Sequence, residues 1–455
     1  MIKDLAAIAG RSNVISGRSR LIDYGRDETP LAKGRPPRVA VKPSDTQTVS
    51  AILKYANEHR IPVTARGGGT GLSGGAIPAP GSICLSLENM NSILEIDRHN
   101  FVAVVQPGLT LGELRDRAAE KGFSYPVSLG EMTATVGGSI ATNAGGMNAV
   151  KYGVTRHHVL GLEAVLAGGE IIRTGGKFVK CSSGYDLTQL LIGSEGTLAV
   201  ITEIILKLNI KPAHREALFI PFHSMKDAIG SVPDILLLGT VPAGLEFMDK
   251  EVMEIAESYT GKKLPYRGYQ AFLLVLYESG SQDEIASYFY DVEKVVKKHG
   301  AADALVPPGQ LAMRRLIEAR ENFYHALKKY APMEITDVVV PRSEIARYVE
   351  DIKKLEQVYG IPVVVYGHAG DGNVHLHPIC KGMTYSVWIK KLPRLMRDIY
   401  RLGAKYCGAV SAEHGIGTDK KRYFNDIADP ALLLTMKKIK VALDPNGILN
   451  PGKIF

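Results

Sequence analysis

The chain has 455 residues, of which 45% are hydrophobic and 22% charged, the ordinary balance of a globular protein long enough for two or three domains. Its 55 Lys and Arg residues against 47 Asp and Glu give a net charge of +8, but they form no dense basic block, which argues against a nucleic-acid partner. No stretch reaches the roughly 18 apolar residues of a membrane span, and the N-terminus lacks the apolar core of a signal peptide. We therefore expect a cytoplasmic protein, with peripheral attachment to the inner face of a membrane left open.

Short strands alternate with glycine-rich turns in the first half of the chain. Alternation of apolar and polar residues predicts strands over 38–42, 61–65, 83–87 and 101–106. Helical periodicity predicts helices over 46–59 and 111–121, with Ser44 or Asp45 and Thr110 as the N-caps.

From about residue 216 the strands alternate with longer amphipathic helices. The predicted strands are 218–222, 244–248, 270–277, 335–341 and 363–366, and the clearest helices are 283–298 and 344–359. This pattern predicts an α+β fold in which an antiparallel sheet carries helices over one face.

A stretch with six glycines in ten residues, Arg66–Gly75, follows the strand predicted at 61–65. Such a backbone can adopt positive φ and bring several N–H groups against one phosphate, although a flexible turn is the alternative interpretation. The stretch lacks the Lys of a P-loop, and residues 72–80 are too rich in Gly and Pro to continue as the helix of a dinucleotide fingerprint. We therefore expect a pyrophosphate cradle of another fold.

Further glycine-rich segments lie at 135–146, 152–153 and 193–198, and together such segments can wrap a long ligand. Segments 66–75, 130–146 and 184–198 resemble the FAD-binding domain of the vanillyl-alcohol oxidase (PCMH-type) flavoproteins. The resemblance runs from about 38 to 207 and returns at 443–453. It implies an FAD-binding domain over 1–212, an inserted cap or substrate domain over 213–410, and a segment over 411–455 that returns to the FAD domain and completes the active site.

The resemblance also implies which residues bind the FAD. It implies a non-covalent cofactor, because the first glycine loop contains no His or Cys; His157 and His158 are the nearby alternatives for a covalent link. The implied FAD-binding residues are Arg66, Gly67, Gly68, Gly69, Thr70, Gly71, Ser73, Gly74, Pro107, Gly108, Gly130, Thr135, Gly137, Gly138, Ala141, Thr142, Asn143, Gly145, Tyr152, Gly153, Glu195, Gly196, Leu198 and Asn450.

The four cysteines are scattered and form no C-x-x-C pair. Their spacing supports neither a disulfide framework nor a set of iron–sulfur ligands. We expect all of them to be buried thiols.

Two segments of the second half carry residues suited to metal chemistry. Residues 366–378 contain His368, His375 and His377, and residues 411–417 read Ser-Ala-Glu-His-Gly-Ile-Gly. If 373–378 is extended, His375 and His377 share one face. Imidazole and carboxylate groups bind divalent metals, and three protein ligands with one open position form the catalytic arrangement, although hydrogen-bonded core histidines are the alternative. We propose His368, His375 and Glu413 as ligands, with zinc first and manganese or iron as alternatives.

Both segments resemble the GHxGDGNxH and EHGIG motifs of the FAD-linked D-2-hydroxyacid dehydrogenase and glycolate oxidase family. The resemblance implies oxidation of a 2-hydroxyacid, with hydride passing to flavin N5, a metal on the hydroxyl group and His414 as the base. It aligns the substrate-carboxylate anchor with Arg320, one of three arginines on a predicted helix. It also places His377 near the substrate.

The strand region 333–341 departs from dicarboxylate-oxidising relatives, which carry a Lys there. Here the residues are apolar or acidic, so D-lactate or glycolate is favoured over 2-hydroxyglutarate. A D-2-hydroxyglutarate dehydrogenase, a non-redox flavoprotein like alkyldihydroxyacetonephosphate synthase, and a flavin-free binding protein remain alternatives. The sequence does not decide among a quinone, an iron–sulfur partner protein and an electron-transfer flavoprotein as electron acceptor, and it leaves open a homodimer.

Overall fold

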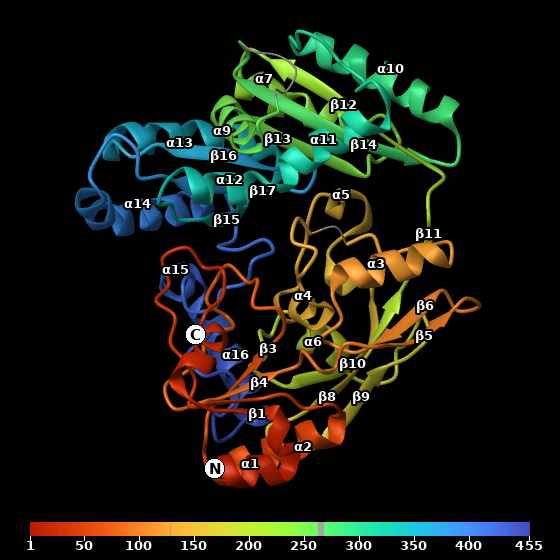
Figure 1. Cartoon of the computed structure of the whole chain (residues 1–455). Helices are drawn as coiled ribbons and strands as arrows, with labels where there is room; N and C mark the ends of the chain where they lie inside the picture. Colours follow the sequence, from red (N-terminus) through yellow and green to blue (C-terminus); the bar gives the residue numbers. More distant parts are fainter. Residues whose placement is uncertain (128, 263–267) are drawn as a thin grey trace.

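The computed structural model describes residues 1–127, 129–262 and 268–455 and shows two bodies, one above the other in Figure 1. The lower body contains both chain ends, and the upper body is formed by the middle of the chain. The chain enters the upper body after β11 and returns before α15, so the upper body is an insertion in the lower one.

The first sheet of the lower body is built from the N-terminal residues. Strands β2, β4 and β3 are parallel, and β1 adds to β2 antiparallel. Their bounds are Val14–Ile15 (β1), Val39–Val41 (β2), Val63–Arg66 (β3) and Ile83–Ser86 (β4). Helices α1 (Ile2–Ala9) and α2 (Thr46–Glu58) lie beside it, and the Asp45 carboxylate caps α2 by accepting a hydrogen bond from the Thr48 N–H at 2.8 Å.

The second sheet of the lower body is antiparallel, in the order β5–β6–β10–β8–β9. Its strands are Ile93–Asp97 (β5), Val102–Val105 (β6), Val159–Val165 (β8), Ile171–Gly175 (β9) and Val200–Lys207 (β10), and a separate pair joins β7 (Phe123–Ser124) to β11 (Asn209–Ile210). The associated helices are α3 (Leu111–Glu120), α4 (Val136–Thr142), α5 (Ala149–Tyr152) and α6 (Leu187–Leu191). Thr110 caps α3 as predicted, through a hydrogen bond from the Glu113 N–H at 3.2 Å.

The upper body, called the cap from here on, contains one antiparallel sheet in the order β12–β14–β13–β16–β17–β15. The strands are His214–Phe222 (β12), Gly244–Asp249 (β13), Ala271–Ser279 (β14), Thr336–Val339 (β15), Val363–His368 (β16) and Asn373–Pro378 (β17). Its helices are α7 (Met225–Gly230), α8 (Val232–Leu236), α9 (Lys250–Thr260), α10 (Gln282–Lys298), α11 (Gly309–Glu321), α12 (Phe323–Tyr330), α13 (Ile345–Tyr359) and α14 (Tyr385–Lys405).

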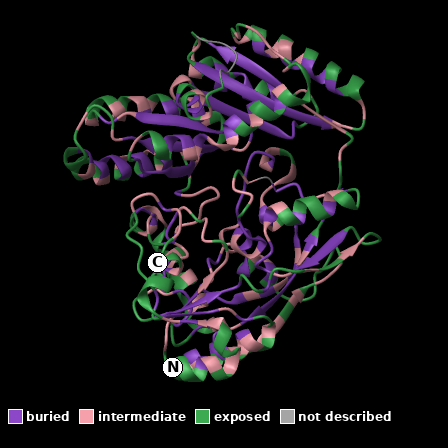
Figure 2. Cartoon of the chain, in the orientation of Figure 1, coloured by how far each residue is buried: buried purple, intermediate pink, exposed green. Residues whose placement is uncertain are grey.

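Helices cover both faces of the cap sheet, not one face as the sequence pattern suggested. One face packs against α7, α8, α10, α13 and α14, and the other against α9, α11 and α12. The reason is visible in β14, whose first seven residues are apolar or aromatic without alternation and are all buried. A strand that is apolar on both sides needs a covering layer on both sides. In Figure 2 the strands of the cap sheet are buried (purple), and the helices that pack on them carry exposed residues (green).

The returning segment, residues 411–455, contacts the cap at one place and the first sheet of the lower body at another. Beside the cap, Ser411 forms an isolated bridge to Asp337 of β15. Beside the first sheet, Leu449 bridges to Val63 and the Asn450 N–H donates to the Val63 carbonyl at 2.7 Å. Between them lie α15 (Lys421–Ile427) and α16 (Pro430–Leu443). The predicted α+β architecture, a two-part domain with an inserted antiparallel cap, is confirmed.

The expectation that all cysteines are buried is wrong for two of them. Cys84 lies in the buried strand β4 and Cys380 is half-buried, but Cys181 and Cys407 are exposed. Both exposed residues lie outside helices and strands, Cys181 in the loop after β9 and Cys407 just beyond α14, where no sheet or helix covers them.

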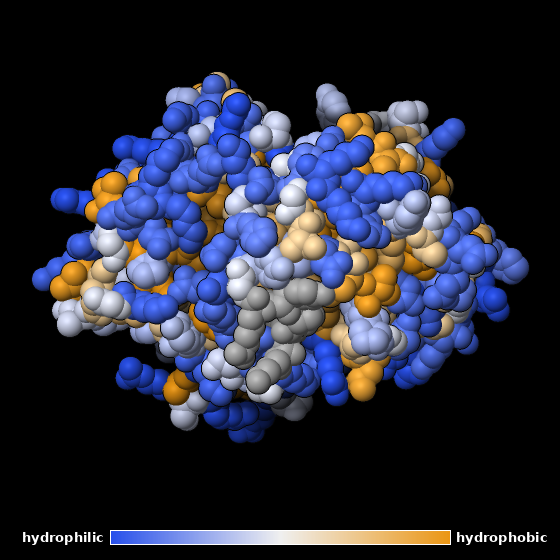
Figure 3. Space-filling view, turned by 90° about the horizontal axis from the view of Figure 1, so that it is seen from above, coloured by the Kyte–Doolittle hydropathy of each residue, from blue (hydrophilic) through white to orange (hydrophobic). Residues whose placement is uncertain are grey.

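Viewed onto the cap, hydrophilic side chains cover most of the surface and hydrophobic ones form smaller groups (Figure 3). Among the described residues, no helix combines the length and apolar character needed to cross a membrane.

Candidate active site

A cavity of about 310 Å³ is walled by both bodies. The lower body contributes the glycine-rich loops, and the cap contributes side chains from α11, α12, β16 and β17. Glu413 and His414 of the returning segment complete the wall. The topology therefore brings three regions that are far apart in the sequence to one space.

In the glycine loops, neighbouring atoms lie so close to several glycines that no side chain would fit there. A Cβ on Gly67 would lie 2.2 Å from Oγ1 of Thr135, and one on Gly137 would lie 2.6 Å from Cβ of Pro107. Gly69 has a φ of 72°, a left-handed conformation that favours glycine. These loops line the cavity with backbone, which fits a ligand that takes hydrogen bonds from N–H groups.

Most of the residues predicted to bind FAD line this cavity. Those that do are Arg66, Gly67, Gly68, Gly69, Thr70, Gly71, Ser73, Pro107, Gly130, Thr135, Gly137, Gly138, Ala141, Thr142, Gly145, Glu195 and Gly196. The structure places the others outside its lining: Gly74, Gly108, Asn143, Tyr152, Gly153, Leu198 and Asn450.

Two of the predicted cofactor residues hold neighbouring segments together. The Asn450 amide donates to the carbonyls of Gly75 and Glu195, at 3.0 and 2.7 Å. The Glu195 carboxylate accepts hydrogen bonds from the N–H groups of Ile416 and Gly417 at 2.7 and 2.8 Å. Glu195 thus ties the glycine loops to the Glu-His-Gly-Ile-Gly segment, a role that its sequence motif did not indicate.

Glu413 lies close to both of the other predicted metal ligands. Oε1 of Glu413 lies 3.4 Å from Nε2 of His368 and 3.4 Å from Nε2 of His375. Two ligands about 2.0–2.1 Å from one ion at the tetrahedral angle are roughly 3.3 Å apart. These separations therefore fit a divalent ion, and they exceed the usual length of a hydrogen bond.

A second grouping of ligand atoms includes His414. Asp337, His375, Glu413 and His414 each offer an atom within 4.8 Å of the others. Asp337, however, already accepts hydrogen bonds from the N–H groups of Ala412, Glu413 and His414, at 3.0, 2.9 and 2.8 Å. It is therefore a poor ligand. His375 and Glu413 of the predicted ligand set belong to this grouping, and His368 lies outside it.

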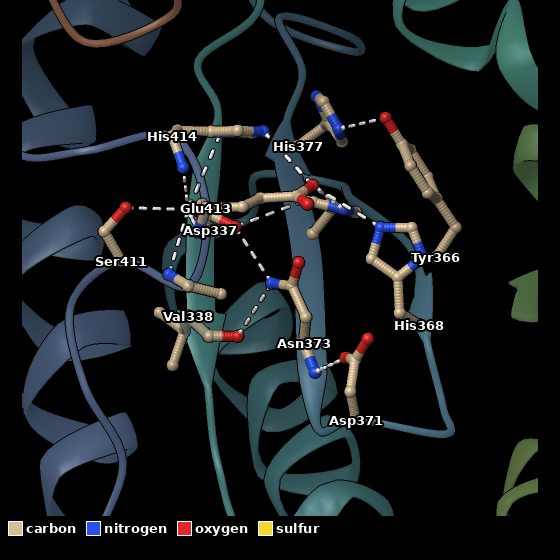
Figure 4. A network of polar contacts seen from close by, with 12 residues as sticks. Asp337, Val338, Tyr366, His368, Asp371, Asn373, His377, Ser411, Glu413 and His414 are labelled. Carbon is tan, nitrogen blue, oxygen red and sulfur yellow. Dashed lines mark hydrogen bonds and ion pairs between the residues drawn. The ribbon is translucent and has the colours of Figure 1, made fainter. Parts of the chain in front are cut away.

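Figure 4 shows how this group is held on β15, β16, β17 and the loop at 411–414. Tyr366 and His368 alternate along β16, and His375 lies opposite Tyr366 on β17. Asp337 lies opposite His375 on β15. Alternation and register place these side chains on one face of the cap sheet.

Arg320 lies in the last turn of α11 and lines the cavity. Its NH2 is 2.6 Å from Oε2 of Glu246, and its guanidinium lies 4.8 Å from the centre of the Tyr366 ring. Arg314 and Arg315 of the same helix are exposed. Of the three arginines that the sequence offered, only Arg320 therefore reaches the site.

His377 is fully buried and is not part of the cavity wall. Its Nε2 lies 3.0 Å from the hydroxyl group of Tyr366, which does line the cavity. The structure thus places Tyr366 between His377 and the cavity.

Burial and neighbouring charges set the protonation of the histidines. Burial lowers the pKa of His375 and of His414, which favours the neutral imidazole. Burial also opposes a charge on His368, but the carboxylates of Glu246 and Glu413 outweigh it and hold its pKa well above the ordinary value. Burial would likewise raise the pKa of Asp337, yet His414, Lys420 and the backbone donors hold it well below its usual range.

The sequence did not indicate three residues of this site: Glu246, Asp337 and Tyr366. The available signal was an acid inside an otherwise apolar strand, as in Gly-Leu-Glu-Phe-Met at 244–248 and Thr-Asp-Val-Val at 336–339. A carboxylate at such a position needs a partner, which marks it as a member of a polar network.

The chain matches the family model described as FAD linked oxidases, C-terminal domain, over residues 211–454, and an FAD binding domain model over 37–175. It is 44% identical to D-lactate dehydrogenase of Archaeoglobus fulgidus over 95% of both chains. It is 37% identical to the glycolate oxidase protein GlcD of Bacillus subtilis over 100% of this chain and 96% of the relative. The fold of p-cresol methylhydroxylase superposes with a TM-score of 0.83 at 18% identity, covering 100% of this chain and 96% of that one.

The chain therefore belongs to the FAD-linked oxidases and is an FAD-linked oxidoreductase of the PCMH-type fold. The glycine-lined cavity fits FAD, whose pyrophosphate accepts the backbone N–H groups that such loops present.

We predict that the FAD is bound without a covalent link. The first glycine loop has no side chain that could form one, and Nε2 of His158 is occupied by the Tyr152 carbonyl at 3.0 Å. Acid precipitation of the purified protein should release all of the yellow colour into the supernatant. Colour that stays with the pellet would contradict the prediction.

We predict that chelation of divalent metal abolishes turnover and leaves the FAD bound, because the metal ligands and the glycine loops are separate segments. His375→Ala should have the same effect. Added Zn²⁺ or Mn²⁺ should restore turnover to the chelated wild-type protein and not to His375→Ala. His299→Ala is the matched control, because it removes a histidine that pairs with Asp234 and does not line the cavity. Full activity in protein that elemental analysis shows to be metal-free would exclude a metal-assisted reaction.

Proposed function

We propose that this protein oxidises a small D-2-hydroxyacid, D-lactate or glycolate, to the corresponding 2-oxoacid with FAD as the electron acceptor in the site. The observation that carries the proposal is the meeting, in one cavity, of glycine loops, a carboxylate 3.4 Å from each of two histidines, and a buried arginine. We assign residues 1–212 and 411–455 to the FAD domain and 213–410 to the cap.

The charges of the cavity wall favour a substrate with one carboxylate. Among the described residues that line the cavity, Arg66 and Arg320 are the Arg or Lys side chains. Arg66 belongs to the first glycine loop and donates to the Arg26 carbonyl at 2.6 Å, which leaves Arg320 for the substrate. Besides Glu195 and Glu413, three further acids, Glu28, Glu131 and Glu321, line the wall. A second carboxylate would meet repulsion there, which supports lactate or glycolate over 2-hydroxyglutarate.

Each residue of the site has a distinct part in the proposed reaction. FAD, when bound, would supply the hydride acceptor. His368, His375 and Glu413 would hold a divalent metal, which would supply a Lewis acid for the substrate hydroxyl. Arg320 binds the carboxylate, and its planar guanidinium fixes that group in orientation.

His414 is the proposed base. Its ring stacks on His375 with centroids 5.3 Å apart. Its buried Nδ1 lies 3.9 Å from Oδ2 of Asp337, and its Nε2 lies 3.8 Å from Oε1 of Glu413. The side chain is 13% exposed and lines the cavity, so Nε2 of a neutral imidazole lies there beside Glu413. Such a group can take the hydroxyl proton as the hydride leaves. His377 would act by supporting Tyr366 through the hydrogen bond between them.

The proposal is tested by anaerobic mixing with glycolate and with the D- and L-forms of lactate and 2-hydroxyglutarate. D-lactate or glycolate should bleach the flavin absorbance fastest, and the L-lactate and 2-hydroxyglutarate reactions should be slower. Fast bleaching by 2-hydroxyglutarate alone would replace the proposed substrate class. Absence of bleaching by every hydroxyacid would favour a non-redox flavoprotein. The reduced enzyme can then be offered a quinone, an iron–sulfur protein or an electron-transfer flavoprotein to find its acceptor.

We predict different kinetic effects for the base and the anchor. His414→Ala should slow flavin reduction by about 10²–10⁴-fold with little change in apparent substrate affinity, since a base acts in the chemical step. Arg320→Ala should chiefly raise KM, and Arg320→Lys should recover little, because an ammonium cannot form the bidentate contact. Arg314→Ala, an exposed arginine of the same helix, should leave both constants unchanged.

Reduction of the His414→Ala flavin at the wild-type rate would mean that the base is another residue. An unchanged KM in Arg320→Ala would likewise exclude Arg320 as the anchor. Stopped-flow reduction at several substrate concentrations separates the two constants.

A further inference from the structure

Glu246 is a fully buried carboxylate in the middle of the apolar strand β13. All six residues of that strand are buried, and Glu246 has 0% exposure. An unpaired carboxylate in such a place is strongly unfavourable. The partners of Glu246 therefore indicate why an acid is kept there.

The two oxygens of Glu246 contact two different parts of the site. Oε1 lies 2.7 Å from Nδ1 of His368, the residue directly opposite on β16. Oε2 lies 2.6 Å from NH2 of Arg320, at the end of α11. One carboxylate therefore touches both a proposed metal ligand and the proposed substrate anchor.

The contact with His368 decides which ring nitrogen is available. A carboxylate at Nδ1 fixes a proton on that nitrogen and leaves Nε2 as the ligand atom. Nε2 is the atom 3.4 Å from Oε1 of Glu413. Glu246 thus turns the imidazole toward the other ligands.

The contact with Arg320 fixes the guanidinium and leaves a donor free. Tyr366 lies against the guanidinium, 4.8 Å from its ring centre, while NH2 faces Glu246. The Nε atom of Arg320 is buried and has no hydrogen-bond partner within the described residues. A buried donor without a partner in a cavity wall is suited to a carboxylate from a ligand.

We propose that Glu246 is a positioning residue that holds His368 and Arg320 at a fixed separation; the proposal rests on the function proposed above. A 2-hydroxyacid carries its hydroxyl and carboxylate groups on adjacent carbons, so the metal and the anchor must lie at one short separation to bind both. A single carboxylate that is hydrogen-bonded to His368 and ion-paired with Arg320 sets that separation. The bridge makes the site selective for the 2-hydroxy position.

The test uses FAD-containing protein stripped of metal, with Zn²⁺ affinity measured by competition against a chromogenic chelator and KM measured with D-lactate after reloading. In Glu246→Gln the amide can still accept the His368 N–H, but it places an NH₂ group or a weaker acceptor against Arg320. We expect a loss of roughly 10–100-fold in Zn²⁺ affinity, as for other partners of metal-bound histidines, together with a rise of about tenfold or more in KM, because the anchor is displaced.

Glu246→Asp separates geometry from charge. It keeps the buried charge but is one methylene shorter, so it cannot reach both partners, and it should show both losses. If Glu246→Gln loses its FAD, Glu246→Asp takes its place in the test. The matched control is Asp249→Asn in the same strand, whose carboxylate instead accepts from the N–H groups of Val252 and Val365. The control should change melting temperature without changing Zn²⁺ affinity or KM.

The outcomes are distinct. If wild-type protein neither binds Zn²⁺ nor is reduced by any 2-hydroxyacid, the proposed function fails, and the role of Glu246 with it. If wild-type protein does both and the Glu246 variants match Asp249→Asn in Zn²⁺ affinity and KM, the positioning role is overturned while the function stands. A change in only one of the two constants also overturns the bridge.

Discussion

The active site depends on one buried carboxylate, Asp337, which joins the returning segment to the cap. Its Oδ2 accepts hydrogen bonds from Ser411 and from the N–H groups of Ala412, Glu413 and His414, and Lys420 lies 3.7 Å away. A carboxylate surrounded by donors stays ionised even when buried, because the donors replace its water. This contact places the backbone of Glu413 and His414 against β15 and so beside the histidines of β16 and β17.

The inserted topology makes that contact necessary. The glycine loops belong to the N-terminal half, the histidines to the cap and Glu413 to a segment that re-enters the lower body. Asp337 connects the cap to the segment that carries Glu413. Glu195 connects that same segment to the glycine loops, because its carboxylate accepts hydrogen bonds from the N–H groups of Ile416 and Gly417. The segment at 411–417 is therefore held from both sides by buried acids. Groups that must react together are fixed by hydrogen bonds to backbone, which leaves few alternative positions.

An apolar layer lies next to the polar site on the same face of the cap sheet. Val364 packs in the cluster formed with α9, α11 and α12, while Tyr366 and His368 follow it along β16 toward the cavity. The face thus changes from apolar to polar along one strand. Buried charges here have partners, as Glu246 does with His368 and Arg320, because an unpaired one would be strongly destabilising.

The sequence by itself determined much of this protein. Hydrophobic periodicity predicted α2 and α3 with their caps and most cap strands, because such signals are local. Glycine clustering predicted the loops that line the cavity, and the two histidine-containing motifs supplied the residues proposed as metal ligands. Only the tertiary structure decided which arginine of α11 faces the cavity, that Tyr366 stands before His377, and that Glu246 and Asp337 support the site. These depend on strand pairing across large sequence separations, and neither spacing nor composition specifies which buried acid meets which histidine.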